Sequence, residues 1–82
     1  MILVDIYIPS VDKTYDFQIN EQSRISTVVE EITEMIGQKE RSRIVGDISK
    51  LLLCEYSTGS VLDPETTLEQ AGIGTGEKLL LV

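Results

Sequence analysis

The sequence contains no histidine, and this absence limits the chemistry open to the protein. Imidazole is the usual general base, the usual partner of a serine or cysteine nucleophile, and a common zinc ligand. Without it, carboxylates, lysines and a single thiol are left to carry chemistry. We therefore expect a protein that is not an enzyme, with no catalytic residue, no cofactor and no metal site.

Cysteine is almost absent as well, because Cys54 is the only one. A lone cysteine excludes an intramolecular disulfide. Cys54 lies in the apolar run LLLCEY, where a free thiol usually packs as a small hydrophobic side chain. Membrane-length apolar runs and the features of a secretory signal are also missing. We expect a cytoplasmic protein that does not insert into a membrane.

Basic residues are scarce. Seven lysines and arginines stand against fourteen aspartates and glutamates, which gives a formal net charge of −7. Nucleic acids and anionic membranes are bound mainly through clustered cations, so neither is an expected partner. The one basic cluster, Lys39, Arg41 and Arg43, is interpreted more simply as cations at the negative end of a helix dipole.

What the sequence does contain is a clear change of hydrophobic period. Residues 2–8 and 14–19 alternate apolar and polar side chains, which predicts two strands joined in a hairpin. Residues 25–36 follow the spacing of an amphipathic helix that could end at Gly37. Two more strands are predicted at 51–56 and 79–82, with a short apolar pair at 61–62 and a helical turn before the last strand. The stretch 38–50 gives no firm pattern.

This order of elements predicts one α+β domain over residues 1–82, in which one main helix covers one face of a mixed sheet.

Three glycines near the end, Gly72, Gly74 and Gly76, are followed by Lys78 and look at first like a phosphate-binding loop. In such loops the glycines open a helix, whose N-terminus holds the phosphate. Here they precede a strand, and the lysine is followed by leucine instead of serine or threonine. We interpret the segment as tight turns in which at least one glycine has a positive φ angle.

A carboxylate site is the other chemical candidate. Glu30 and Glu34 share a helix face, with Glu31 beside them. Because no other kind of ligand accompanies them, a solvated helix face is the simpler interpretation.

The last part of the sequence resembles that of ubiquitin-like proteins. The order of elements and the spacing of apolar residues both fit this family. Within it, the sequence most resembles the YukD-like, or EsaB-like, proteins of Gram-positive type VII (WXG100) secretion systems. These bacterial proteins share the segment L-x-x-(A/C)-G-I-x-x-G-(D/E)-x-L, matched here by Leu68, Ala71, Gly72, Ile73, Gly76, Glu77 and Leu79. The resemblance implies a β-grasp fold, with a mixed sheet of four to five strands. It also implies a non-catalytic accessory role in the cytoplasm, through binding to protein partners such as the membrane components of the secretion system.

The end of the sequence bears on a second function. Ubiquitin and the related sulfur carriers act through a flexible extension that ends in Gly-Gly. This sequence ends at Val82, a β-branched residue in a predicted strand. We therefore expect neither conjugation nor sulfur transfer.

A protein-binding surface is predicted on the face of the sheet that points away from the helix. Alternation along the first and last strands sends their outward residues to that face, and we expect the third strand to add to it, with Glu55 on the same side. A contiguous apolar group on a monomer usually marks a partner or an interface between copies, so a homodimer is an alternative occupant. The predicted surface residues are Leu3, Tyr7, Leu51, Leu53, Leu80 and Val82.

Three functions therefore stand at this point. The first is an interaction protein of type VII secretion. The second is a ubiquitin-like modifier or sulfur carrier, and the third is an excised cytosolic ubiquitin-like domain of a larger membrane component of the secretion system.

Overall fold

A computed structural model describes residues 1–40 and 51–82 of the chain. Its elements in chain order are β1 (Ile2–Ile8), β2 (Lys13–Ile19), α1 (Ile25–Glu40), β3 (Leu53–Glu55) and β4 (Lys78–Leu81). The predicted hairpin, main helix and last strand are all present. Most of the stretch that gave no firm pattern, from residue 41 to residue 50, lies outside the described residues, and so do two members of the basic cluster, Arg41 and Arg43.

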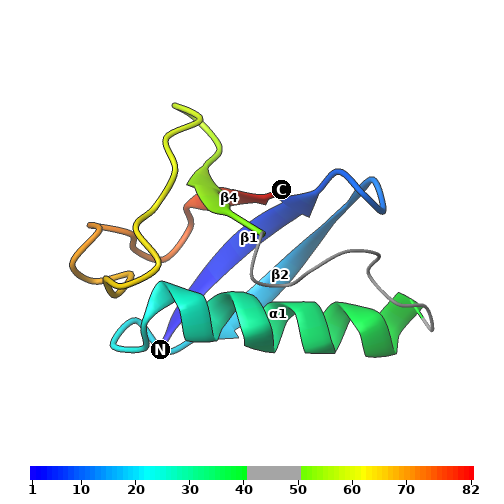
Figure 1. Cartoon of the computed structure of the whole chain (residues 1–82), viewed down its shortest axis with the longest axis horizontal. Coiled ribbons are helices and arrows are strands. Elements are labelled where there is room, and N and C mark those ends of the chain that lie inside the picture. The colour runs from blue at the N-terminus through cyan, green and yellow to red at the C-terminus, as the bar shows by residue number, and fades with distance from the viewer. Residues whose placement is uncertain (41–50) are drawn as a thin grey trace.

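The four strands form one mixed sheet in the order β2-β1-β4-β3. β1 pairs antiparallel with β2 and parallel with β4, and β4 pairs antiparallel with β3. The two central strands therefore come from opposite ends of the sequence. Figure 1 shows α1 lying along one face of this sheet, which confirms the predicted α+β arrangement.

The core lies between the sheet and α1, because alternate residues of the strands meet one apolar face of the helix. On β1, Val4 and Ile6 are 0% exposed, and on β4 the same is true of Leu79. Ile32 of α1 is equally buried. The remaining buried members of the cluster are Ile8, Phe17, Ile19, Ile25, Val28, Val29, Ile36, Leu53, Leu62, Leu68, Ile73 and Leu81.

α1 begins at Ile25, as predicted, but it ends beyond the predicted stop. The helix continues through Gly37 to Glu40, since one glycine in a helix costs only about 1 kcal/mol relative to alanine. At its start, the first two amides, of Ile25 and Ser26, donate to the carbonyl oxygens of Thr66 and Pro64 at 2.8 and 3.0 Å. A distant loop therefore satisfies donors that the end of a helix leaves without partners.

Residues 67–73 form the predicted helical turn before the last strand. At its start, Thr67 and Gln70 exchange hydrogen bonds between side chain and backbone at 3.0 Å each, which is a capping box. At its end, Gly72 has a φ of 77°, and the amide of Ile73 donates to the carbonyl of Leu68 at 2.9 Å, as in a Schellman motif. This single helical turn is therefore capped at both its N-terminal and its C-terminal end.

The third strand is shorter than predicted. β3 spans only Leu53–Glu55, and the apolar pair that follows contributes one isolated bridge between Cys54 and Val61. Leu52 and Val82 nevertheless exchange backbone hydrogen bonds at 2.7 and 2.9 Å, which extends the pairing of β3 and β4 beyond the strands themselves.

Candidate protein-binding surface

The face of the sheet opposite α1 carries four of the predicted surface residues. Leu3 is 50% exposed and Val82 is 47% exposed, whereas Tyr7 and Leu80 are half-buried. Tyr7 of β1 lies beside Leu80 of β4 in the parallel register. Alternation along the two central strands thus places these side chains on the outer face, and their role in binding stays a prediction.

The expected outward placement of Leu51, Leu53 and Glu55 is wrong. Leu53 is 1% exposed and lies across from Leu81 on the helix side, and Leu51 packs partly buried against the core. Glu55 lies across from the buried Leu79 and accepts a hydrogen bond from Thr58 at 3.0 Å. The run LLLC has no polar residue to show its alternation, and a shift of one residue moves every side chain to the other face.

The outward residues around β3 are instead Leu52, Cys54 and Tyr56. Cys54 lies between Leu80 on one side and Val61 on the other, so one row of side chains crosses the sheet from Tyr7 to Val61. The exposed fractions of Leu52, Tyr56 and Val61 are 42%, 49% and 56%. We define the outer apolar surface as Tyr7, Leu52, Tyr56, Val61, Leu80 and Val82.

Leu3 lies apart from this surface. Its carbonyl accepts from the amide of Gly76 at 2.9 Å and its amide donates to Oγ1 of Thr75, so it sits beside the turn that precedes β4. Asp5 and Lys78, which lie side by side in the register of β1 and β4, separate it from Tyr7. The outer face is therefore divided by a polar row.

Aromatic contacts join the side chains at one edge of the outer apolar surface. The rings of Tyr7 and Tyr56 meet edge to face with centroids 6.4 Å apart. The ammonium of Lys78 lies 4.2 Å from the centroid of Tyr56, which is a cation–π contact. Tyrosine supplies a large contact area at low entropic cost, and it is enriched among the residues that dominate binding energy at protein interfaces.

Two carboxylates face each other on the outer side of the hairpin. Asp5 and Asp16 are directly opposite in the register of β1 and β2. A hydrogen bond from one carboxyl group to the other, partial desolvation and mutual repulsion raise the pKa of Asp5, and Lys78 opposes this shift. This pair was not predicted from the sequence, although the register of the predicted hairpin could have revealed it.

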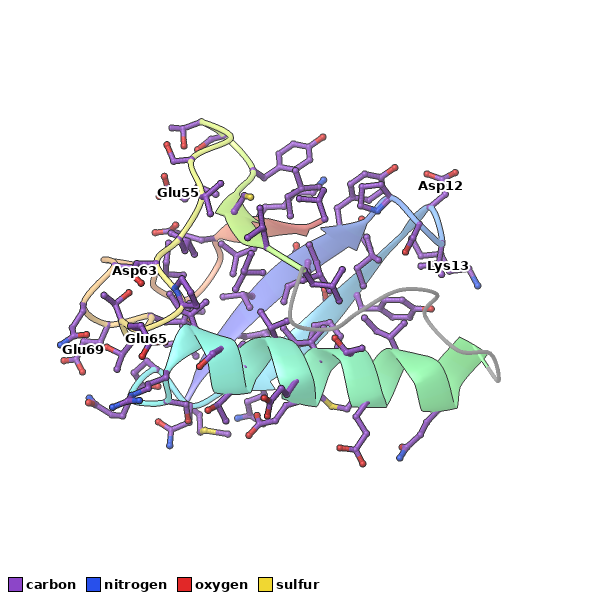
Figure 2. The ribbon with its side chains drawn as sticks, in the orientation of Figure 1. Asp12, Lys13, Glu55, Asp63, Glu65 and Glu69 are labelled. Carbon is purple, nitrogen blue, oxygen red and sulfur yellow. The ribbon has the colours of Figure 1, made fainter. Side chains whose placement is uncertain are left out.

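The tip of the hairpin adds a third carboxylate. The hydroxyl of Tyr7 donates to Oδ1 of Asp12 at 2.8 Å, and this hydrogen bond raises the pKa of Tyr7. Asp12 has a φ of 52°, in the left-handed region that aspartate tolerates better than most residues. In Figure 2, Asp12 and Lys13 point away from each other at this tip.

The candidate chemical groups are dispersed. Glu30, Glu31 and Glu34 are exposed on α1, and the thiol of Cys54 is buried. Among residues 1–40 and 51–82, no group of three or more carboxylate or thiol side chains is placed to hold a metal ion. In the same part of the chain, no helix has the length and apolar character needed to span a membrane.

The three glycines occupy turns. Gly72 and Gly76 have φ angles of 77° and 92°, as predicted for at least one of them. The amide of Gly74 donates to the carboxylate of Glu77 at 3.4 Å, so an anion of the chain itself already occupies the position that a phosphate would take.

Comparison with solved structures shows what this chain is similar to. No protein-family model and no curated protein matches it. The EccD5 ubiquitin-like domain from Mycobacterium xenopi is similar with a TM-score of 0.80 and 18% identity, over 99% of this chain and 91% of that one.

Two further neighbours agree with this likeness. A designed protein based on human erythrocytic ubiquitin has a TM-score of 0.75 at 24% identity, over 100% of this chain and 90% of that one. The ubiquitin-like domain of Plasmodium falciparum Dsk2 has a TM-score of 0.75 at 15% identity, over 99% and 95% of the two chains. With its mixed four-stranded sheet and single main helix, the chain has the ubiquitin-like β-grasp fold.

Proposed function

We propose that this chain is a non-catalytic ubiquitin-like interaction domain that binds a protein partner through the outer apolar surface. The observation that carries the proposal is the exposure of Leu52, Tyr56, Val61 and Val82 around the row from Tyr7 to Leu80. A contiguous apolar group of this kind marks an interaction site far more often than single exposed residues do.

The residue inventory supports a role in binding over a role in catalysis. Histidine is absent from the sequence, and the one thiol, of Cys54, is 4% exposed. Among the described residues, the carboxylates with shifted pKa values are Asp5 and Glu21. Asp5 interacts with Asp16 and Glu21 with the N-terminal ammonium, so the two do not form an acid–base pair with each other.

Type VII secretion is the process we propose for this binding. The segment from Leu68 to Leu79 resembles that of the YukD-like proteins, and its Gly72 and Gly76 occupy the left-handed turns that such a pattern requires. The likeness to the EccD5 ubiquitin-like domain is consistent with the same process. The partner would be a component of the membrane machinery, bound in the cytoplasm.

A second candidate is a ubiquitin-like domain that forms part of a larger membrane component. The likeness to EccD5 favours it, because that structure is itself a ubiquitin-like domain. A hydrophobic span encoded after Val82 would identify this case, and a Gly-Gly extension there would instead identify a modifier or sulfur carrier. The backbone of Val82 itself is paired with Leu52, so a mobile tail could only begin after it.

Native affinity purification of the tagged protein from its own host tests the proposal. Proteins bound to the wild type and to the variants Leu52→Asp and Thr27→Asp would be identified by mass spectrometry. Both variants add one carboxylate at an exposed position, on the outer apolar surface and on α1 respectively. Circular dichroism would establish that each is folded.

We expect a membrane component of the secretion system to be recovered with wild type and Thr27→Asp and lost with Leu52→Asp. Loss with Thr27→Asp alone would place the binding site on the helix. Recovery of a covalently attached target or of a bound activating enzyme would instead indicate that the chain is a ubiquitin-like modifier or sulfur carrier.

A further inference from the structure

Charge is unevenly distributed around the outer apolar surface. Several acidic side chains away from it are engaged within the fold: Glu65 pairs with Arg24 at 3.7 Å, and Glu69 accepts a hydrogen bond from the side-chain amide of Gln22. Figure 2 places Glu65 and Glu69 on the loop between β3 and β4. The N-terminal ammonium lies 2.9 Å from Glu21. These carboxylates already have partners of their own.

The carboxylates on the outer side of the hairpin are placed differently. Asp16 lies opposite Asp5, which is another acid, and Asp12 lies beyond them at the tip. The cation on the other side of Asp5, Lys78, has its ammonium over the ring of Tyr56. One flank of the outer apolar surface is therefore negative, in a chain whose formal net charge is −7.

We infer that the outer apolar surface accepts a basic amphipathic segment of a partner protein, whose apolar side chains cover Tyr7 and Leu80 while an arginine or lysine lies between Asp5 and Asp16. This inference rests on the proposed function and adds the chemistry of the partner. A cation between two opposed carboxylates replaces their repulsion by charge-assisted hydrogen bonds, which are stronger than neutral ones. Complementary charge also fixes the orientation of the bound segment and speeds its association.

A second copy of the chain fits this surface less well. A two-fold dimer uses the same patch of both copies, so both acidic flanks, formed by Asp5, Asp12 and Asp16, would enter the interface. Among the described residues of β1 and β4, Lys78 is the cation placed beside this flank to offset them. With an excess of seven negative charges, two copies also repel each other at long range.

Two synthetic amphipathic helical peptides of equal length test the inference. They share the same leucine positions, and every polar position is arginine in one and glutamate in the other. Each would be titrated into the isotope-labelled full chain, with binding followed residue by residue through amide chemical shifts. The Asp5→Asn/Asp16→Asn double variant would be compared with Glu30→Gln/Glu34→Gln, which removes the same charge from the exposed face of α1.

We expect the arginine peptide to shift the amides of Tyr7, Leu52 and Leu80 and to bind more tightly than the glutamate peptide. The Asp5→Asn/Asp16→Asn variant should bind it about fivefold more weakly, since each exposed ion pair contributes little. The control variant should bind like wild type. Salt of about 1 M, where the screening length falls to about 3 Å, should weaken the arginine peptide most.

Equal binding of both peptides to the outer apolar surface would contradict the inference that the partner segment is basic, without contradicting the proposed function. Binding that is indifferent to Asp5→Asn/Asp16→Asn, or no binding of either peptide, would also overturn the inference, while the native purification decides the proposed function separately. Shifts confined to α1 would count against both. Shifts of Tyr7 and Leu80 that depend on protein concentration alone would identify a second copy as the occupant.

Discussion

Asp5 on β1 lies directly across from Asp16 on β2, so two carboxylates of like charge face each other on the open side of the sheet. Like charges directly opposite in an antiparallel pair destabilise it. We predict that Asp16→Asn raises the midpoint of urea unfolding at neutral pH. Glu31→Gln, which removes the same charge from an exposed position on α1, is the control and should change the midpoint less.

The gain from Asp16→Asn should depend on pH. The pKa of Asp5 is raised in the folded state, so the favourable protonated pair is present below the ordinary value of 3.8 and is lost as pH rises through the raised pKa. The difference between variant and wild type should therefore be small in acid and largest near neutrality. Urea titrations at a series of pH values check this, and a gain that grows toward acid would contradict it.

Exposed and buried leucines should respond very differently to a carboxylate. Leu79→Asp buries a charge at a position that is 0% exposed, and such changes cost more than about 4 kcal/mol. A chain of this size has a total stability of roughly 4–12 kcal/mol, so Leu79→Asp and likewise Ile32→Asp should be largely unfolded.

Leu3→Asp, at a position that is 50% exposed, should stay within about 0.5 kcal/mol of wild type. The half-buried Leu80→Asp should also remain folded. Thermal unfolding followed by circular dichroism measures all four variants. Equal unfolding of the Leu3 and Leu79 variants would mean that the two faces of the sheet are misassigned.

Two glycines offer a matched comparison of backbone conformation. Gly72 has a φ of 77°, whereas Gly74 is not in the positive region, and a Cβ atom would meet nothing within 4 Å at either position. Gly72→Ala should cost about 1–2 kcal/mol, because an L-residue is strained in the left-handed region. Gly74→Ala should be neutral or slightly stabilising, since it restricts the unfolded chain. Chemical denaturation of the two variants gives the comparison, and equal costs would argue against the Schellman turn.

The hydrogen bond from Tyr7 to Asp12 should be visible in an alkaline titration. Because this bond raises the pKa of Tyr7, its stabilisation is present below the ordinary value of 10.0 and is lost as pH rises through the raised pKa. Asp12→Ala should move the titration of Tyr7 to lower pH, as followed by the ring signals in NMR spectra. A Tyr7 titration that is unchanged in Asp12→Ala would show that the bond does not form in solution.

Local patterns in the sequence predict most of the elements, and they fail where distant partners decide. The alternation along β1 shows that the face carrying Val4 and Ile6 is buried, because more polar residues separate these side chains. The run at 51–53 has no such markers, so its register depends on pairing with Leu80 and Leu81, far along the chain. The start of α1 at Ile25 follows from the local pattern, whereas the partner of its first amide, the carbonyl of Thr66, could not be predicted from it.

Only part of the outer apolar surface could be predicted, because some of its members depend on pairing with distant strands. Tyr7, Leu80 and Val82 follow from alternation alone, whereas Leu52, Tyr56 and Val61 require the register of β3 and the bridge to Cys54. The charge beside the surface follows from the register of the hairpin, which pairs Asp5 with Asp16.

The pairing of β1 with β4 has a consequence for the order in which the chain can fold during synthesis. A ribosome releases β1, β2 and α1 long before β4, and until Leu79 arrives the inner edge of β1 has no neighbour. An open strand edge invites pairing with another chain, and contacts between distant residues form slowly. Until β4 has been synthesised, the nascent chain can form the hairpin and the helix but not the complete sheet. Folding is completed only when β4 pairs with β1 on one side and β3 on the other.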